Sequence, residues 1–198
     1  MLFRSRGQLA ARRNSISGDS ERQKLGSVRE VALPPEALAL SALSRVDYSD
    51  AFWLETRHVR EKTGEEWARA LLEDAPAATR MTLRRGWIAL GVRLGTPEDE
   101  RLGLGWTVRH SSPEFAVLAA RSLIGLDAEV LVKREQDALL VATIMKLENP
   151  VARVVWAAVS PRHRRVVRHL VKEAGRRAGE SATRKETNRK HREHDRTP

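Results

Sequence analysis

The chain has 198 residues, no cysteine and a formal net charge of +10. This length predicts one domain that can bury a core of its own, and the lack of cysteine excludes disulfides, thiolate metal sites and cysteine nucleophiles. Residues 1–28 carry six basic and two acidic side chains, and residues 179–198 carry six and four. Most of the positive excess therefore lies at the two ends, which argues against a domain that reads nucleic acid with one basic face.

The N-terminal residues 1–28 are polar and are predicted to form a disordered tail. An Arg- and Ser-rich start is also compatible with a transit peptide, but no apolar segment follows the early arginines, so a secretory signal is not expected. The longest apolar runs, 115–120 and 154–159, have six residues each, and a bilayer span needs roughly 20. We expect a soluble, cytoplasmic protein.

The first strand is predicted over 50–55, after two prolines, Pro34 and Pro35, which would end any strand starting near Val28. A helix is expected from Thr63, because Thr63 and Glu66 have the spacing of a capping box. A second helix is expected to open at Pro76 as its first residue and to run toward Gly95.

After Gly103 the apolar residues alternate with a period of two. This spacing predicts four strands, at 106–111, 115–122, 127–134 and 138–147. The short turns between the strands indicate antiparallel hairpins. Asn149 and Pro150 then suit the N-cap and first position of a helix over 150–177, which should be interrupted or kinked at Pro161 and end near Gly175 or Gly179. Residues 179–198 are polar and are predicted to be a second disordered tail.

Four segments, Arg45–Phe52, Gly125–Val130, Glu148–Trp156 and Ser160–Val167, resemble an uncharacterised bacterial family of the START-like, polyketide-cyclase-like (SRPBCC) superfamily. The order of predicted elements is similar to that superfamily too, over about 29–174. The resemblance implies an α+β helix-grip domain over 29–178, in which a curved antiparallel sheet wraps around the C-terminal helix. It also implies a cavity between the two that binds or carries a small apolar, lipid- or polyketide-like ligand.

Six residues are candidates for contacting such a ligand: Tyr48, Asp50, Trp106, Arg121, Trp156 and His163. His163 could move a proton or simply hydrogen-bond the backbone at the kink. Asp50 beside Tyr48 could do acid–base work, or it could cap a turn, as Asp47 could. Trp106 and Trp156 could line the cavity or fill the core.

Arg121 shares a strand face with Phe115 and Val117. If that face is the inner one, the arginine is buried and needs an anionic partner. That partner would be a ligand carboxylate or a protein acid such as Asp127. On the preceding strand, alternation places Arg109 on the face opposite to Trp106 and Val108, so Arg109 is expected to be solvated.

No catalytic set, metal site or cofactor is predicted. His163 and His169 are six residues apart and would point to different sides of a helix, and no phosphate loop, dinucleotide fingerprint or serine-hydrolase elbow occurs. Two alternatives to ligand carriage stay open. The first is a cyclase or aromatase in which Tyr48, Asp50 or His163 polarises a carbonyl group. The second is contact of the basic helix face over 162–177 and the tails with an anionic membrane or nucleic acid.

Overall fold

The computed structural model describes residues 26–92, 101–102 and 105–194. Within them, one antiparallel 7-stranded sheet has the strand order β1-β2-β7-β6-β5-β4-β3. The strands are β1 (Val28–Val31), β2 (Tyr48–Glu55), β3 (Arg101–Leu102), β4 (Trp106–Ser111), β5 (Phe115–Arg121), β6 (Leu126–Arg134) and β7 (Ala138–Leu147). The helices are α2 (Pro35–Leu38), the 3-10 turn η1 (Val59–Glu61), α3 (Gly64–Leu72), α4 (Ala77–Ala89) and α5 (Pro150–His194).

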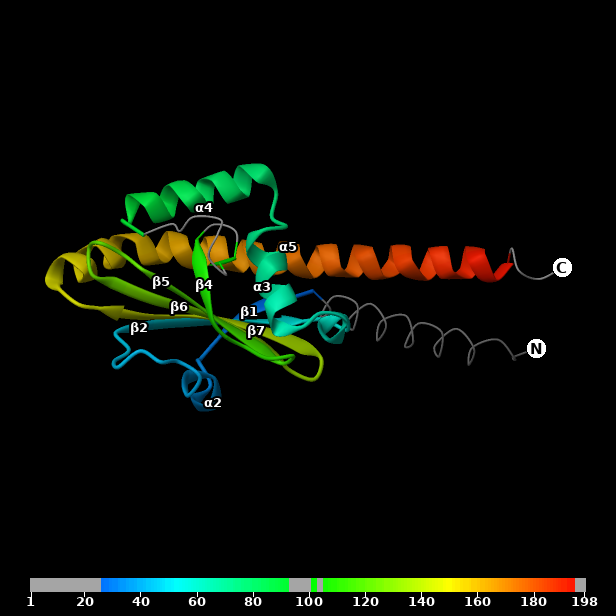
Figure 1. The fold of residues 1–198 in the computed structure, drawn as a ribbon, viewed down its shortest axis with the longest axis horizontal. Coiled ribbons are helices and arrows are strands. Elements are labelled where there is room, and N and C mark those ends of the chain that lie inside the picture. The colour runs from blue at the N-terminus through cyan, green and yellow to red at the C-terminus, as the bar shows by residue number, and fades with distance from the viewer. Residues whose placement is uncertain (1–25, 93–100, 103–104, 195–198) are drawn as a thin grey trace, which may run out of the picture.

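The layers of the molecule follow the predicted α+β helix-grip class. Figure 1 shows α5 lying across one face of the curved sheet, with α3 and α4 on the same side and α2 on the opposite side. We call the face that α5 covers the inner face and the other the outer face. The four predicted strands after Gly103 are confirmed, with ends that differ by one residue at most.

The strand predicted over 50–55 is present as β2, but it is the second strand of the chain, because the short strand β1 precedes it. β1 pairs with β2 in antiparallel register, with Val28 opposite Leu54, so the two helices α3 and α4 follow the second strand and not the first. The four residues of β1 are too few to show a clear alternation, and an edge strand of this kind is fixed by its partner. The helix α4 begins at Ala77, with Pro76 as the residue before it.

α5 is much longer than predicted. It passes through Pro161 without a break in the helix and continues beyond Gly175 and Gly179 to His194, so its C-terminal half projects past the sheet (Figure 1). Gly175 serves packing and does not end the helix, since a Cβ there would come within 2.7 Å of Leu54 Cδ2. The segment after it is polar, but it is rich in good helix formers. The predicted N-terminal tail lies outside the described residues as far as position 25.

Both predicted helix caps are confirmed. The Thr63 hydroxyl accepts a hydrogen bond from the Glu66 amide at 3.2 Å, and the Glu66 carboxylate accepts from the Thr63 amide at 2.6 Å. Asn149 Oδ1 accepts from the Ala152 amide at 2.8 Å. These bonds fix where α3 and α5 start, and hence which of their faces meet the sheet.

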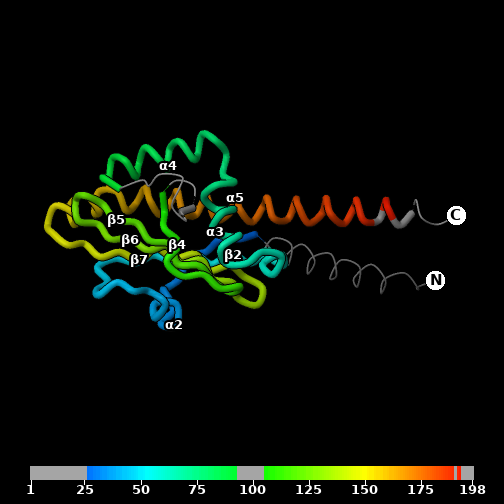
Figure 2. Tube along the Cα trace, viewed as in Figure 1, coloured from blue at the N-terminus to red at the C-terminus, as the bar shows by residue number. Residues whose placement is uncertain are grey.

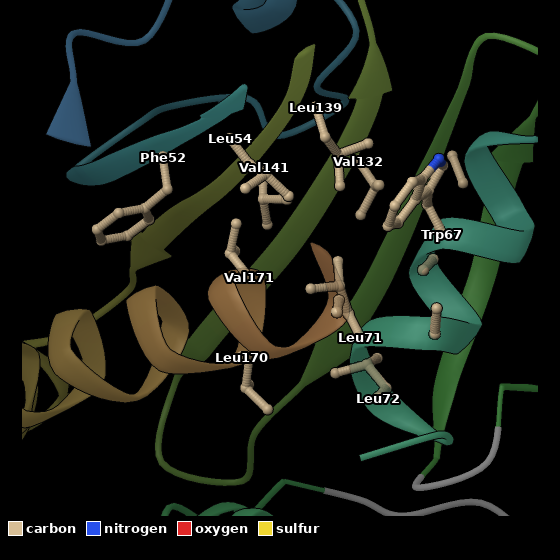
Figure 3. Close-up of a cluster of buried hydrophobic side chains, with 14 of the residues drawn as sticks. Phe52, Leu54, Trp67, Leu71, Leu72, Val132, Leu139, Val141, Leu170 and Val171 are labelled. Atoms are coloured by element: carbon tan, nitrogen blue, oxygen red, sulfur yellow. The ribbon is translucent and has the colours of Figure 1, made fainter. Parts of the chain in front are cut away.

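The main core fills the space between the inner face, α3 and α5 (Figure 3). Phe52 and Leu54 of β2 contribute from the sheet, Leu170 and Val171 from α5, and Trp67 from α3, all buried. The Trp67 indole N–H also donates to the carbonyl of Val59 at 2.9 Å. This hydrogen bond joins α3 to η1 and fixes the position of α3 at the edge of the core.

The outer face is covered by α2 and the residues after it. Glu129 of β6 is buried there at 1% exposure and accepts hydrogen bonds from the Ser41 hydroxyl at 2.6 Å and from the Ala42 amide. Arg109 donates to the same carboxylate at 2.8 Å. A buried carboxylate needs such partners, and here they hold the covering segment against the sheet.

An apolar cavity with a polar end

A cavity of about 100 Å³ lies between the inner face, α3, α4 and α5. Its walls are aliphatic and aromatic side chains, among them Trp87, Trp106, Leu118, Val130, Trp156 and Val167. Two hydrophilic residues, Thr143 of β7 and His163 of α5, also reach it. An apolar pocket with a few converging polar groups is the usual form of a small-molecule site.

The polar end of the cavity is a connected group of five side chains, which we call the polar cluster. The Tyr48 hydroxyl donates to Asp50 Oδ2 at 2.6 Å, and His163 Nε2 lies 3.4 Å from the same oxygen. Thr143 Oγ1 lies 3.1 Å from His163 Nε2. The Trp156 ring packs edge-on to the rings of both Tyr48 and His163, with centroids 5.1 and 5.0 Å away.

The cluster follows from sheet register. Asp50 on β2 lies opposite Thr143 on β7, and opposed residues of two strands point to the same face. Both therefore point toward α5, where His163 completes the contact. The Asp50 side chain is only 2% exposed and that of His163 22%, so the polar groups meet in a largely dry environment that strengthens their interactions.

Burial changes the protonation of the cluster. It lowers the pKa of His163 below the ordinary value of 6.5, a shift that the Asp50 carboxylate opposes and the Arg164 charge reinforces. Burial raises the pKa of Tyr48, and the hydrogen bond to Asp50 raises it further. At neutral pH His163 is therefore a neutral imidazole beside a carboxylate, and Tyr48 keeps its proton.

Three buried polar atoms around the cavity have no hydrogen-bond partner among the described residues: Asp50 Oδ1, Trp106 Nε1 and Trp156 Nε1. Buried polar atoms are nearly always paired, and an unpaired one costs about 1–3 kcal/mol. Two of the three belong to residues that line the cavity directly, and Asp50 belongs to the polar cluster.

The sequence candidates divide into two groups. Tyr48, Asp50, Trp156 and His163 come together in the polar cluster, and Trp106 lines the cavity from β4, where its ring packs edge-on to Trp87 with centroids 5.5 Å apart. Arg121 does not join them. Its side chain is 82% exposed, so it is not the buried arginine of the inner-face alternative. It forms an ion pair at 3.0 Å with Asp127, the protein acid that was expected from the sequence as its partner in that case.

Arg121 is exposed because the strand face it shares with Phe115 and Val117 is the outer one, where these two pack in a separate core cluster. Arg109 is half exposed, yet it is bonded to Glu129 and not simply solvated. Asp47 acts in turn structure, since its carboxylate accepts from the Leu147 amide at 2.8 Å and from Arg45.

Thr143 is not among the residues that the sequence singled out. The signal was available, because Thr143 and Lys146 are the two polar residues of the otherwise apolar stretch Ala138–Leu147. A hydroxyl in a buried strand needs a partner. The partner, His163, is on a different element, and a single sequence does not reveal that proximity.

The predicted basic face of α5 is largely engaged with the protein itself. Arg164 and Arg168 approach Glu30 of β1, and Arg177 donates to the carbonyl of Ala70 at 2.8 Å. Arg176 pairs with Glu173 and with Glu180.

None of the helices in the described part of the chain combines the length and the apolar character that a membrane span requires. Among the same residues, no group of three or more His, Asp or Glu side chains lies close enough together to hold a metal ion.

The lowered pKa of His163 predicts a pH dependence of stability. Above pH 6.5 the imidazole is neutral in the folded and the unfolded chain. As the pH falls below 6.5 the unfolded chain takes up the proton first, so the free energy of unfolding falls until the lower, folded pKa is passed. In urea titrations across this range, wild type should lose stability relative to His163→Gln. The loss should be at most about 1.4 kcal/mol for every pH unit between the unfolded and the folded pKa.

The matched variant is Asp50→Asn. It removes the one attraction that favours the charged imidazole, so the pKa of His163, followed by NMR, should fall further than in wild type. A pKa at or above 6.5 in wild type, or a rise in Asp50→Asn, would contradict the assigned environment.

No protein-family model matches the chain, and no curated protein matches it. The similarity to the START-like superfamily therefore stays a prediction drawn from the local sequence segments, and the functional argument depends on the cavity itself.

Proposed function

We propose that the protein binds a small, mostly apolar molecule that carries a hydroxyl or similar group, with its apolar part in the cavity and its polar group at the polar cluster. The observation that carries this proposal is an apolar cavity bordered by buried polar atoms without protein partners. In the proposed complex the hydroxyl group of the ligand accepts a hydrogen bond from the indole N–H of Trp156, whose side chain lines the cavity. It donates one to the polar cluster, where Asp50 Oδ1 has no partner among the described residues.

The cavity volume limits the size of the ligand. An apolar cavity of about 150 Å³ is known to admit benzene, so a space of about 100 Å³ suits a compact molecule. A lipid- or polyketide-sized ligand requires α4 to move outward. α4 is suited to this, since none of its residues is fully buried and it meets the main core through Leu83 and Trp87.

The test measures the affinity of the full chain for two pairs of compounds by isothermal titration calorimetry. The first pair is benzene and phenol, and the second is naphthalene and 1-naphthol. Each hydroxylated compound should bind more tightly than its hydrocarbon, by about five- to tenfold for one satisfied pair of hydrogen bonds. Solvent extraction and mass spectrometry of the purified protein should also yield an apolar, oxygen-bearing molecule.

Two matched variants locate the site. Ala128→Leu adds three carbons inside the cavity, where Ala128 lines the wall, and should weaken phenol binding at least about tenfold. Ala119→Leu adds the same group to the outer face of the neighbouring strand, beside an open hollow next to Glu129, and should leave binding unchanged. Equal effects of the two variants, or equal affinity for phenol and benzene, would argue against the proposal.

A second candidate function is catalysis of the cyclase or aromatase type on such a ligand. The 3.4 Å approach of His163 Nε2 to Asp50 favours it, because a neutral imidazole beside a carboxylate can act as a general base. His163→Gln and Asp50→Asn would then stop conversion of the extracted molecule while binding persists. Unchanged conversion in both variants would leave ligand binding as the function.

A further inference from the structure

One end of the molecule exposes four large aliphatic side chains. Val154 is 71% exposed, Leu123 68%, Val151 61% and Ile88 56%. They come from three elements, namely the last turn of α4, the turn between β5 and β6, and the first turns of α5. We call these four residues the apolar tip. Single exposed aliphatics are ordinary, but a gathering of them marks an interaction surface.

Hydrogen bonds bring the three elements together. The Leu123 amide donates to the carbonyl of Gly91, directly after α4, at 2.9 Å. On the other side of the turn, Asn149 Nδ2 donates to the carbonyl of Ile124 at 3.0 Å, and the Glu148 amide donates to the carbonyl of Gly125. The β5–β6 turn is thus held between the end of α4 and the start of α5, and Figures 1 and 2 show all three at the same end of the molecule.

The surroundings of the apolar tip are cationic. Residues 77–92 contain three arginines and no acidic residue, and the first turns of α5, residues 150–161, contain Arg153 and no acidic residue. Arg84 and Arg85 precede Ile88 by about one helical turn, and Arg153 is adjacent to Val154. The acids nearest to the tip in sequence, Asp127 and Glu148, are paired with Arg121 and Lys146.

These cations are also more available than the rest of the basic helix. Arg84 and Arg85 are exposed, and neither has an ion-pair or hydrogen-bond partner among the residues that the structure describes. Farther along α5, Arg164 and Arg168 face Glu30. The free positive charge and the exposed aliphatic surface therefore coincide at the tip.

We propose that the apolar tip docks on the surface of an anionic lipid bilayer, with Leu123, Val151 and Val154 entering the headgroup boundary and Arg84, Arg85 and Arg153 near the lipid phosphates. Aliphatic side chains ringed by arginines fit such a surface, since apolar burial and attraction to anionic headgroups both favour binding. A nucleic acid would use the cations and leave the aliphatic side chains exposed to water. This inference does not depend on what the cavity binds.

The absence of cysteine from the chain allows a direct test with single labels. Leu123→Cys, carrying an environment-sensitive fluorophore, should brighten when phosphatidylcholine vesicles containing phosphatidylglycerol are added, and much less with phosphatidylcholine alone. The matched control is Leu38→Cys. Leu38 is an exposed leucine of α2 on the opposite face of the sheet, and its label should not respond.

Vesicle cosedimentation of the full chain supplies the affinity. Leu123→Glu should weaken binding to the phosphatidylglycerol vesicles about tenfold or more, Arg85→Gln about fivefold, and Leu38→Glu should have no effect. Circular dichroism would verify that the variants keep their fold. Absence of binding by wild type would overturn the proposal. So would binding that salt abolishes but Leu123→Glu leaves unchanged, because the attraction would then come from another basic segment.

Discussion

Trp67→Ala is expected to lower the free energy of unfolding by about 3–5 kcal/mol, the range for removing a large aromatic side chain from a core. Trp67 is completely buried and lies between α3 and the inner face of the sheet, as Figure 3 shows. The variant also deprives the Val59 carbonyl of its indole donor. Equilibrium urea unfolding measures the change.

Trp53→Ala is the matched control. Trp53 is half-buried on the outer side of the sheet, where Arg29 lies over its ring at 5.5 Å. Its truncation leaves no closed cavity and should cost about 1–2 kcal/mol. Equal losses in the two variants would mean that the packing between α3 and the sheet contributes less than the structure indicates.

Gly64→Ala should cost at least about 2 kcal/mol, although it adds a single carbon atom. A Cβ at Gly64 would lie 2.3 Å from the carbonyl carbon and 2.5 Å from the Cα of Phe115. This backbone cannot yield easily, because β5 is hydrogen-bonded to β4 on one side and β6 on the other. The start of α3 would have to move away from the sheet.

The control for this substitution is Gly86→Ala. Gly86 lies within α4, and apart from its chain neighbours and the backbone of its own helix no atom lies within 4 Å of the added Cβ. Alanine should therefore stabilise the protein by about 0.5–1 kcal/mol through its higher helix propensity. Thermal unfolding of both variants would show opposite shifts in Tm. A loss in Gly86→Ala, or no loss in Gly64→Ala, would contradict these placements.

The cavity proposal and the bilayer proposal predict different results for the Trp67→Ala variant. A Trp67→Ala protein that stays folded should lose ligand affinity, since Ala68 and Leu71 of the same helix line the cavity. The apolar tip lies on other elements and should keep its vesicle binding. Measuring both properties in one variant would separate the cavity from the bilayer surface.

The sequence by itself determined the features that depend on neighbours a few residues away. The capping box of Thr63 and Glu66, the cap at Asn149 and the turns after β4 and β6 follow from local hydrogen bonds and short connections, so their positions could be predicted. The alternation of apolar residues likewise located four of the strands.

Only the tertiary structure decided which strand face is the inner one and which side chains of distant elements meet. A period of two assigns Arg121 to one of two strand faces but does not say which is inner, and that choice depends on where α5 packs. The pairing of Asp50 with His163 joins a strand near the start of the domain to a helix near its end, through the register of β2 with β7. The apolar tip arises in the same way, because three turns that are distant in sequence expose their aliphatic side chains at one end of the fold.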